Sequence, residues 1–456
     1  MKLLMRVAYL STVLLSFYLG SVIVAAEVTS KWQGKLTTPG GALDIIIELN
    51  ESKQSGSISV PAQSLHDMKL DVVTINKPDF TFEVKPLGII YRGKIDADNI
   101  TGIFKQGPVF EAELNFAKQS QEQQKAIADA LSRPQTPKGP FPYLEEEVSI
   151  TNGDVVLSGT VTKPKGNGPF PAAIMITGSG PQDRDETILG HKPFKVIADH
   201  LSRRGLLVLR FDDRGFAKST GTFKGATIQD FASDVEAVFQ YLKSRDDVNN
   251  KKIGLIGHSE GGAVGPLMAA NNDEVAFIVS LAGIGTSPKE LYATQQRDIL
   301  LMNGAQGGEL IFNTFMEAID KVVTGGKPED VSTLLKTKLR YPDDAADMVG
   351  RFMTDPWFIS LMNYDNAATI SKLKMPVLAV NGEKDIQVEP NANLDDFQKY
   401  LTAAGNQDFT ITKIDGLNHL FQPSETGNIS EYGNIPVTFD EATLKMVGDW
   451  ITKRIQ

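Results

Sequence analysis

The pattern of hydrophobic and polar positions changes near residue 119. Between residues 27 and 118, apolar and polar side chains alternate in short runs that Gly, Pro, Asn and Asp residues separate. Alternation puts every second side chain on one face, which is typical of half-buried β-strands. Many short strands joined by turns predict a small β-barrel or β-sandwich. The clearest runs are 43–49, 56–60, 80–84, 88–93 and 109–114.

From residue 143 to residue 456, continuous apolar runs alternate with helical patterns. Unbroken apolar runs are typical of parallel strands that are buried on both faces. Thr227 with Asp230 three positions later resembles a capping box that begins a helix. This alternation predicts an α/β fold with a mostly parallel sheet and helices on both faces. Strands are expected at 171–177, 206–211, 253–256, 275–282, 375–380 and 409–414, and helices at 193–204, 262–270 and 439–455.

Two further segments complete the predicted domain organisation. Residues 119–142 combine a short helical pattern with a proline-rich stretch, which predicts a stiff linker between a β-rich domain (27–118) and the α/β domain. A helix-rich insertion at about 285–370 interrupts the alternation. Ligands of parallel sheets bind at the carboxyl edge, so this insertion is expected to form a lid there. Ordinary helical core is the alternative for most of its apolar residues.

The first 26 residues have the layout of a secretory signal peptide. Lys2 and Arg6 precede an apolar run at 7–24, and Ala25 and Ala26 end it. Cleavage after Ala26 would give an exported protein, periplasmic or secreted. An uncleaved anchor is the alternative, since the run approaches the length that spans a bilayer. No later segment is comparably apolar, so no stable membrane insertion is expected after cleavage.

Composition narrows the chemistry. The chain carries 46 Lys and Arg against 56 Asp and Glu, a net charge of −10, which is unfavourable for binding nucleic acid. It has no cysteine, so thiol nucleophiles, disulfides and zinc–thiolate sites are excluded. The five histidines are scattered and show no metal-ligand spacing. We therefore expect neither a metal nor another cofactor.

A G-x-S-x-G motif, Gly257-His258-Ser259-Glu260-Gly261, lies between a predicted strand and a predicted helix. A sharp strand-to-helix turn exposes a serine hydroxyl, and the flanking glycines permit a backbone that a Cβ would block. The motif makes Ser259 the candidate nucleophile. A purely structural glycine turn is the alternative.

A serine hydroxyl needs an adjacent base, and in this arrangement the chain order is Ser, acid, His. His419 is the only histidine after Ser259, and it follows the predicted strand 409–414. Asp385 follows the strand 375–380 and is the candidate acid that would hold the tautomer of the base and stabilise its charged form. Glu383 is the fallback acid. Ordinary surface roles for these loop residues are the alternative.

Acyl transfer also needs donors for the oxyanion of its transition state. The predicted donors are the backbone N–H groups of Glu260 and of Ser179, which lies in a glycine-containing loop after the strand 171–177. Arg214 is expected to form a structural ion pair that fixes its turn. Residues 183–185 are expected to shape the oxyanion loop.

Together these motifs resemble exported bacterial α/β-hydrolases of the EstD esterase type, close to serine aminopeptidase S33-like and dienelactone-hydrolase-like sequences. The resemblance covers roughly residues 143–456 and implies an α/β-hydrolase that acts mostly on short-acyl carboxylic esters. One departure is Ala217, where such relatives often carry glycine. The motifs that carry the resemblance are 177–185, 210–215, 257–262, 381–385 and 416–419.

The expected function is therefore a serine carboxylesterase that cleaves a small-molecule ester through an acyl-enzyme. The same triad would serve a peptidase or aminopeptidase, or a thioesterase or acyltransferase. A binding protein that keeps the fold without catalysis is the alternative from another class. The complete Ser–Asp–His order argues against a binding protein, because only chemistry requires all three residues together.

Overall fold

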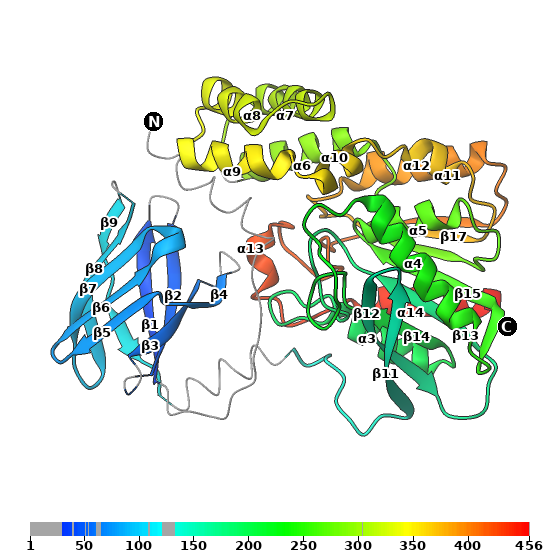
Figure 1. Cartoon of the computed structure of the whole chain (residues 1–456), viewed down its shortest axis with the longest axis horizontal. Helices are drawn as coiled ribbons and strands as arrows, with labels where there is room; N and C mark the ends of the chain where they lie inside the picture. The colour runs from blue at the N-terminus through cyan, green and yellow to red at the C-terminus, as the bar shows by residue number, and fades with distance from the viewer. Residues whose placement is uncertain are drawn as a thin grey trace. The chain divides into compact units, whose positions relative to one another are not determined.

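The computed structural model describes residues 30–456 except for short gaps. The predicted signal peptide (1–26) and residues 121–132 of the predicted helix and linker lie outside the described residues. The gaps are residues 39–40, 51, 53, 61–64, 108–109, 121–132, 303 and 456. The described residues divide into two compact units, one of residues within 30–120 with 430–436, and one of residues within 133–429 with 437–455 (Figure 1).

The N-terminal unit is built on a ten-stranded antiparallel sheet, which agrees with the predicted β-rich domain. Its strands are β1 (Ser30–Thr38), β2 (Gly41–Asn50), β3 (Ser55–Val60), β4 (Leu65–Lys69), β5 (Val72–Asn76), β6 (Asp79–Val84), β7 (Ile89–Ile95), β8 (Asn99–Gln106), β9 (Phe110–Glu113) and β10 (Phe116–Lys118). The order is β4-β3-β2-β1-β10-β8-β7-β6-β5, and β9 pairs with β8.

This sheet curls into a half-barrel (Figure 1). The side chain of Gln54, beside β3, donates to the Ile75 carbonyl in β5 at 3.3 Å and accepts from the Ile75 N–H at 3.4 Å, so the two ends of the sheet approach each other. Alternate side chains of the strands fill the interior, where Phe82 and Tyr91 stack with ring centroids 5.0 Å apart. The hydrophobic alternation in the sequence is therefore the inward face of this sheet.

The second unit is built on an eight-stranded sheet, with β11 (Tyr143–Asn152), β12 (Val155–Pro164), β13 (Phe170–Ile176), β14 (Leu207–Phe211), β15 (Val248–His258), β16 (Ile278–Leu281), β17 (Val377–Gly382) and β18 (Phe409–Ile414). The order is β11-β12-β14-β13-β15-β16-β17-β18. The strands from β14 to β18 pair in parallel, and β11 and β12 form an antiparallel hairpin at one edge. This arrangement confirms the predicted α/β-hydrolase fold.

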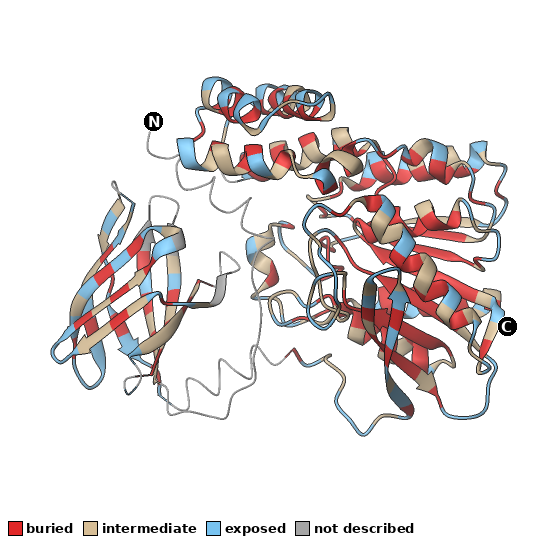
Figure 2. Cartoon of the chain, viewed as in Figure 1, coloured by how far each residue is buried: buried red, intermediate tan, exposed pale blue. Residues whose placement is uncertain are grey.

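Helices cover both faces of this sheet. Ile174 and Met175 are consecutive residues of β13 and at most 1% exposed, although successive strand side chains point to opposite faces. Figure 2 shows the same burial along the central strands. The covering helices include α3 (Pro193–Arg203), α4 (Ile228–Lys243), α5 (Gly261–Ala269), α12 (Pro390–Ala403) and α14 (Glu441–Ile455). The predicted capping box at α4 is present, since Thr227 and Asp230 exchange both bonds.

In the sequence, a group of helices connects β16 to β17, which is where the helix-rich insertion was predicted (Figure 1). The helices have an aromatic core, in which Tyr292 meets Phe358 at 4.8 Å between ring centroids. This packing agrees with the core interpretation of the insertion's apolar residues. Within the described residues, no helix combines the length and the apolarity that crossing a membrane requires. The elements are α6 (Pro288–Met302), α7 (Gly308–Val323), α8 (Pro328–Leu334), η3 (Leu335–Leu339), α9 (Asp343–Met353), α10 (Pro356–Met362) and α11 (Asn366–Ile370).

Candidate active site

Ser259 occupies a strained turn between β15 and α5. Its φ is +53°, in the left-handed region that a residue with a Cβ rarely adopts. The Ser259 N–H donates to the carbonyl of Leu281 in β16 at 2.9 Å, which holds the turn against the next strand. Strain of this kind persists where the surrounding structure enforces it, and it often marks a functional site.

Close backbone contacts, rather than positive φ angles, explain the glycines of the motif. A Cβ at Gly257 would overlap the backbone of Gly261. A Cβ at Gly261 would overlap the carbonyl oxygen of Ile176 at the end of β13. Both glycines therefore let α5 start directly against the sheet, which is what a nucleophile turn requires.

The structure brings His419 and Asp385 together from two separate loops. His419 Nδ1 lies 2.8 Å from Asp385 Oδ2, and both residues are buried. The other oxygen of Asp385 accepts the N–H groups of Gln387 at 2.8 Å and Val388 at 2.9 Å. Glu383 instead accepts the N–H of Gly416 at 2.9 Å. The pairing therefore favours Asp385 over the fallback Glu383 as the acid.

The loop that carries His419 lies beside the nucleophile turn. His258 Nε2 is 3.0 Å from the carbonyl oxygen of His419, and the two ring centroids are 4.8 Å apart. Among the described residues, no hydrogen bond joins the Ser259 hydroxyl to the His419 ring. Such bonds are often long in free enzymes and tighten when substrate binds.

The predicted oxyanion loop packs against Ser259. A Cβ built on Gly178 would stand 3.2 Å from the Ser259 Cβ, so the loop approaches the nucleophile closely. Within the part of the chain that the structure describes, the N–H groups of Ser179 and Glu260 donate to no protein acceptor. Two free N–H groups at this place are available to an oxyanion.

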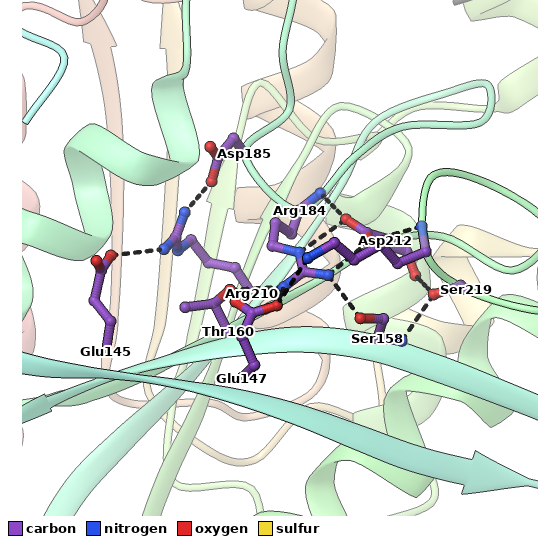
Figure 3. A network of polar contacts seen from close by, with 10 residues as sticks. Glu145, Glu147, Ser158, Thr160, Arg184, Asp185, Arg210, Asp212 and Ser219 are labelled. Atoms are coloured by element: carbon purple, nitrogen blue, oxygen red, sulfur yellow. Dashed lines mark hydrogen bonds and ion pairs between the residues drawn. The ribbon is translucent and has the colours of Figure 1, made fainter. Parts of the chain in front are cut away.

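Ion pairs hold the oxyanion loop on the β11–β12 hairpin and β14 (Figure 3). Arg184 binds Asp212 through two nitrogens, at 2.7 and 3.0 Å, and also reaches Glu147 at 2.9 Å. Arg210 pairs with Asp185. Residues 184 and 185 thus shape this loop, as the sequence predicts.

The turn after β14 contributes two more features. Arg214 pairs with Asp234 of α4 at 2.6 Å, so the predicted structural ion pair is present. Ala217 has a φ of +47°, a conformation that favours glycine. This φ explains why glycine is expected at that position from the resemblance.

Glu260 has an unusual environment for a carboxyl group. It is 2% exposed, its Oε1 accepts the indole N–H of Trp357 in α10 at 2.8 Å, and its Oε2 has no partner among the described residues. Burial raises the pKa of Glu260 to about 7, against the hydrogen bonds from Trp357 and Ser179, which lower it. The side chain therefore loses its proton near neutral pH.

Glu260 should make folding stability depend on pH. Between pH 4.5 and about 7 the folded chain keeps a proton that the unfolded chain releases, so stability falls as pH rises through this range. Glu260→Gln removes this term. As pH rises from 4.5 to 8, the original chain should therefore lose stability that the variant keeps. We expect the unfolding free energy of the variant minus that of the original chain to increase by up to roughly 3 kcal/mol over this range. Urea melts at several pH values measure it, and parallel curves would contradict the raised pKa.

Sequence reasoning did not single out three residues that the structure joins to this site, namely Glu186, His258 and Trp357. His258 lies inside the G-x-S-x-G motif, so its position was visible, but its partner Glu186 becomes apparent only in three dimensions. Within the described residues, no group of three or more His, Asp or Glu side chains is arranged to hold a metal ion.

Comparison with known proteins gives several relatives. The chain is 29% identical over 287 residues to the esterase EstD of Thermotoga maritima, a match that covers 63% of this chain and 62% of EstD. It is 32% identical over 127 residues to the uncharacterized protein YfhR of Escherichia coli K12, covering 27% and 42% of the two chains. The chain thus spans less than two thirds of either relative.

Among solved structures, the esterase Pf2001 of Pyrococcus furiosus superposes with a TM-score of 0.45 and 18% identity, covering 71% of this chain and 97% of that one. The model of the family described as serine aminopeptidase, S33, matches residues 192–425, which is just over half of the 456 residues. The matched range includes Ser259, Asp385 and His419. The chain belongs to the serine aminopeptidase S33 family of α/β-hydrolases.

Proposed function

We propose that this protein is a serine ester hydrolase, with Ser259 as nucleophile, His419 as general base and Asp385 as the residue that orients the base. One observation carries the proposal, which is the buried 2.8 Å contact between Asp385 and His419 Nδ1 in a loop that lies against the strained Ser259 turn. Nothing in the packing of the sheet requires these three residue types to meet.

The proposed mechanism follows from the proton positions. Asp385 accepts the Nδ1 proton of His419, so Nε2 is free to take the Ser259 proton as the hydroxyl oxygen attacks the ester carbonyl carbon. The N–H groups of Ser179 and Glu260 stabilise the tetrahedral oxyanion. Collapse breaks the ester C–O bond, and His419 returns the proton to the departing alcohol. Water then attacks the acyl-enzyme with the same proton transfers, which releases the acid and Ser259.

Short-acyl esters are the proposed substrates. A small pocket lies beside Gly178 and Glu260, and Arg214 and Asp234 line another part of it. Its walls are largely apolar, so a short acyl chain would bury its methylene groups there. The relative EstD is named an esterase, which supports the ester rather than the amide as the bond that is cleaved. The apolar residues of the wall are Ile176, Phe211, Phe223, Phe231, Val235 and Val264.

A substrate panel tests the proposed activity. We expect rapid hydrolysis of p-nitrophenyl acetate and butyrate, slower hydrolysis of the octanoate, and no release of nitroaniline from an aminoacyl-p-nitroanilide. An ester expels its alcohol more readily than an amide expels its amine. A protein that supplies only a triad and oxyanion donors should therefore cleave the esters faster. Faster cleavage of the anilide would establish a peptidase instead, and silence towards all four would leave a binding protein on a hydrolase fold.

Export to the periplasm or medium is also proposed, on the charge and hydrophobic pattern of residues 1–26. Cell fractionation with sequencing of the mature N-terminus tests it. A chain that starts at Glu27 supports cleavage, whereas retention of Met1 in the membrane fraction would contradict it.

The helical insertion is proposed to act as a lid, because Trp357 of α10 already contacts Glu260 beside the nucleophile.

A further inference from the structure

His258 and Glu186 form a buried pair beside the proposed triad. His258 Nδ1 lies 2.8 Å from Glu186 Oε1, and both side chains are almost completely buried. The second ring nitrogen of His258, Nε2, lies 3.0 Å from the carbonyl oxygen of His419. Glu186 Oε1 also accepts the N–H of Gly178 at 2.9 Å. One continuous chain of hydrogen bonds therefore links Gly178, Glu186, His258 and His419.

The proton positions in this series of hydrogen bonds are constrained by the groups at its two ends. A carbonyl oxygen only accepts, so the His258 Nε2 that faces His419 must carry a proton. The opposite nitrogen faces a carboxyl group in a buried site. Burial opposes a charged ring, but the carboxylate of Glu186, together with the His419 carbonyl and Asp385, outweighs burial and raises the pKa of His258. A doubly protonated ring would donate in both directions, to Glu186 and to the His419 carbonyl.

The connected elements are far apart in the sequence. Gly178 begins the proposed oxyanion loop, His258 immediately precedes the nucleophile, and His419 supplies the base. Residue 258 ends β15, while the other two lie in loops after β13 and β18. A loop that carries a catalytic side chain needs an anchor, because misplacement by about 1 Å can cost 100-fold in rate.

We propose that His258 and Glu186 form an ion pair and act as positioning residues that hold the oxyanion loop and the His419 loop in register with Ser259. This inference rests on the proposed function. The carboxylate that favours the charged form of His258 also balances that charge, so the pair as a whole does not oppose the charge that the His419 ring, 4.8 Å away between centroids, gains during catalysis. Neither residue touches the reacting atoms in this scheme.

Two single variants and their combination test the pair. Glu186→Gln removes the counter-charge, so His258 loses one proton and can donate to only one partner. His258→Gln keeps one donor arm and cannot reach both Glu186 and the His419 carbonyl. We expect each to lower kcat for p-nitrophenyl butyrate about 10- to 100-fold with KM changed less than about threefold. The double variant should lose little more, because the pair acts as a unit.

Asp247→Asn is the matched control, because it breaks another carboxylate ion pair, with Arg245 at 2.8 Å, just before β15 and therefore at the end of that strand opposite Ser259. It should lower the melting temperature by as much as Glu186→Gln while leaving kcat within about threefold. Nitrogen-15 spectra of labelled histidine should show both ring nitrogens of His258 protonated at pH 7 in the original chain. They should show one protonated nitrogen in Glu186→Gln.

The rate at which a p-nitrophenyl phosphonate labels Ser259 separates the two proposals. If the original chain is not labelled, the proposed function fails. Labelling of the original chain supports the proposed function. If the Glu186 and His258 variants are then labelled at the same rate and hydrolyse the ester at the same rate as the original chain, the positioning role is overturned. A singly protonated His258 ring in the original chain would overturn the ion pair on which the role depends.

Discussion

Replacement of Ser259 by alanine should lower kcat for p-nitrophenyl butyrate by about 10⁴- to 10⁶-fold. The variant lacks the oxygen that forms the acyl-enzyme, while the backbone N–H donors of Ser179 and Glu260 remain. What activity persists would come from oxyanion stabilisation and substrate binding alone. Steady-state kinetics on freshly purified protein measure the loss, and mass spectrometry should show that a fluorophosphonate adds to the original chain and not to the variant.

Ser280→Ala is the matched control for this experiment. Ser280 is a fully buried serine in β16, the strand next to β15, and its hydroxyl has no partner among the described residues. Loss of this hydroxyl should leave kcat within about threefold, because nothing in the proposed mechanism uses it. If Ser259→Ala retained most of the activity, the assignment of the nucleophile would be wrong.

Asp385→Asn should lower kcat by about 10⁴-fold without unfolding the protein. The N–H groups of Gln387 and Val388 hold Oδ1 of Asp385, so an asparagine would keep its oxygen there and turn its NH₂ group towards His419. An NH₂ group donates to Nδ1, which moves the ring proton to Nε2. The base would then present a proton to Ser259 where it must accept one. Kinetics and a melting curve on the same sample distinguish this effect from unfolding.

Glu383→Gln provides the comparison for Asp385. Its side chain accepts only the Gly416 N–H in the described structure, which a glutamine oxygen also accepts, so kcat should change less than about threefold. The opposite outcome, with Glu383→Gln inactive and Asp385→Asn active, would transfer the role of the acid to the fallback residue.

The sequence pattern located the six parallel strands of the α/β unit and helices α3, α4, α5 and α14. The predicted strand 409–414 coincides with β18, and the predicted helix 193–204 matches α3 within one residue. These elements are buried on a defined face, so their sequence carries the spacing of that face. The strand predicted at 275–282 is shorter in the structure, because β16 pairs with its neighbours only over residues 278–281.

Strands with mixed composition escaped the sequence analysis. β1 has only two strongly buried apolar side chains, Trp32 and Leu36, among polar residues. The hairpin of β11 and β12 lies at the edge of its sheet, where β11 is partly exposed and carries three consecutive Glu residues, 145–147, that interrupt the apolar pattern. Such strands are defined by pairing partners that are distant in the sequence, and no local pattern reports those partners.

The candidate site divides in the same way. The motif around Ser259, the single downstream histidine and the turn carboxylate are local features of the chain, so the sequence by itself determined which residues to propose. Only the tertiary structure decided that Asp385 rather than Glu383 faces His419, that Glu260 meets Trp357, and that Glu186 pairs with His258. The physical reason is that hydrogen-bond partners are set by how loops from different strands converge at one sheet edge, and no periodicity within a segment records that convergence.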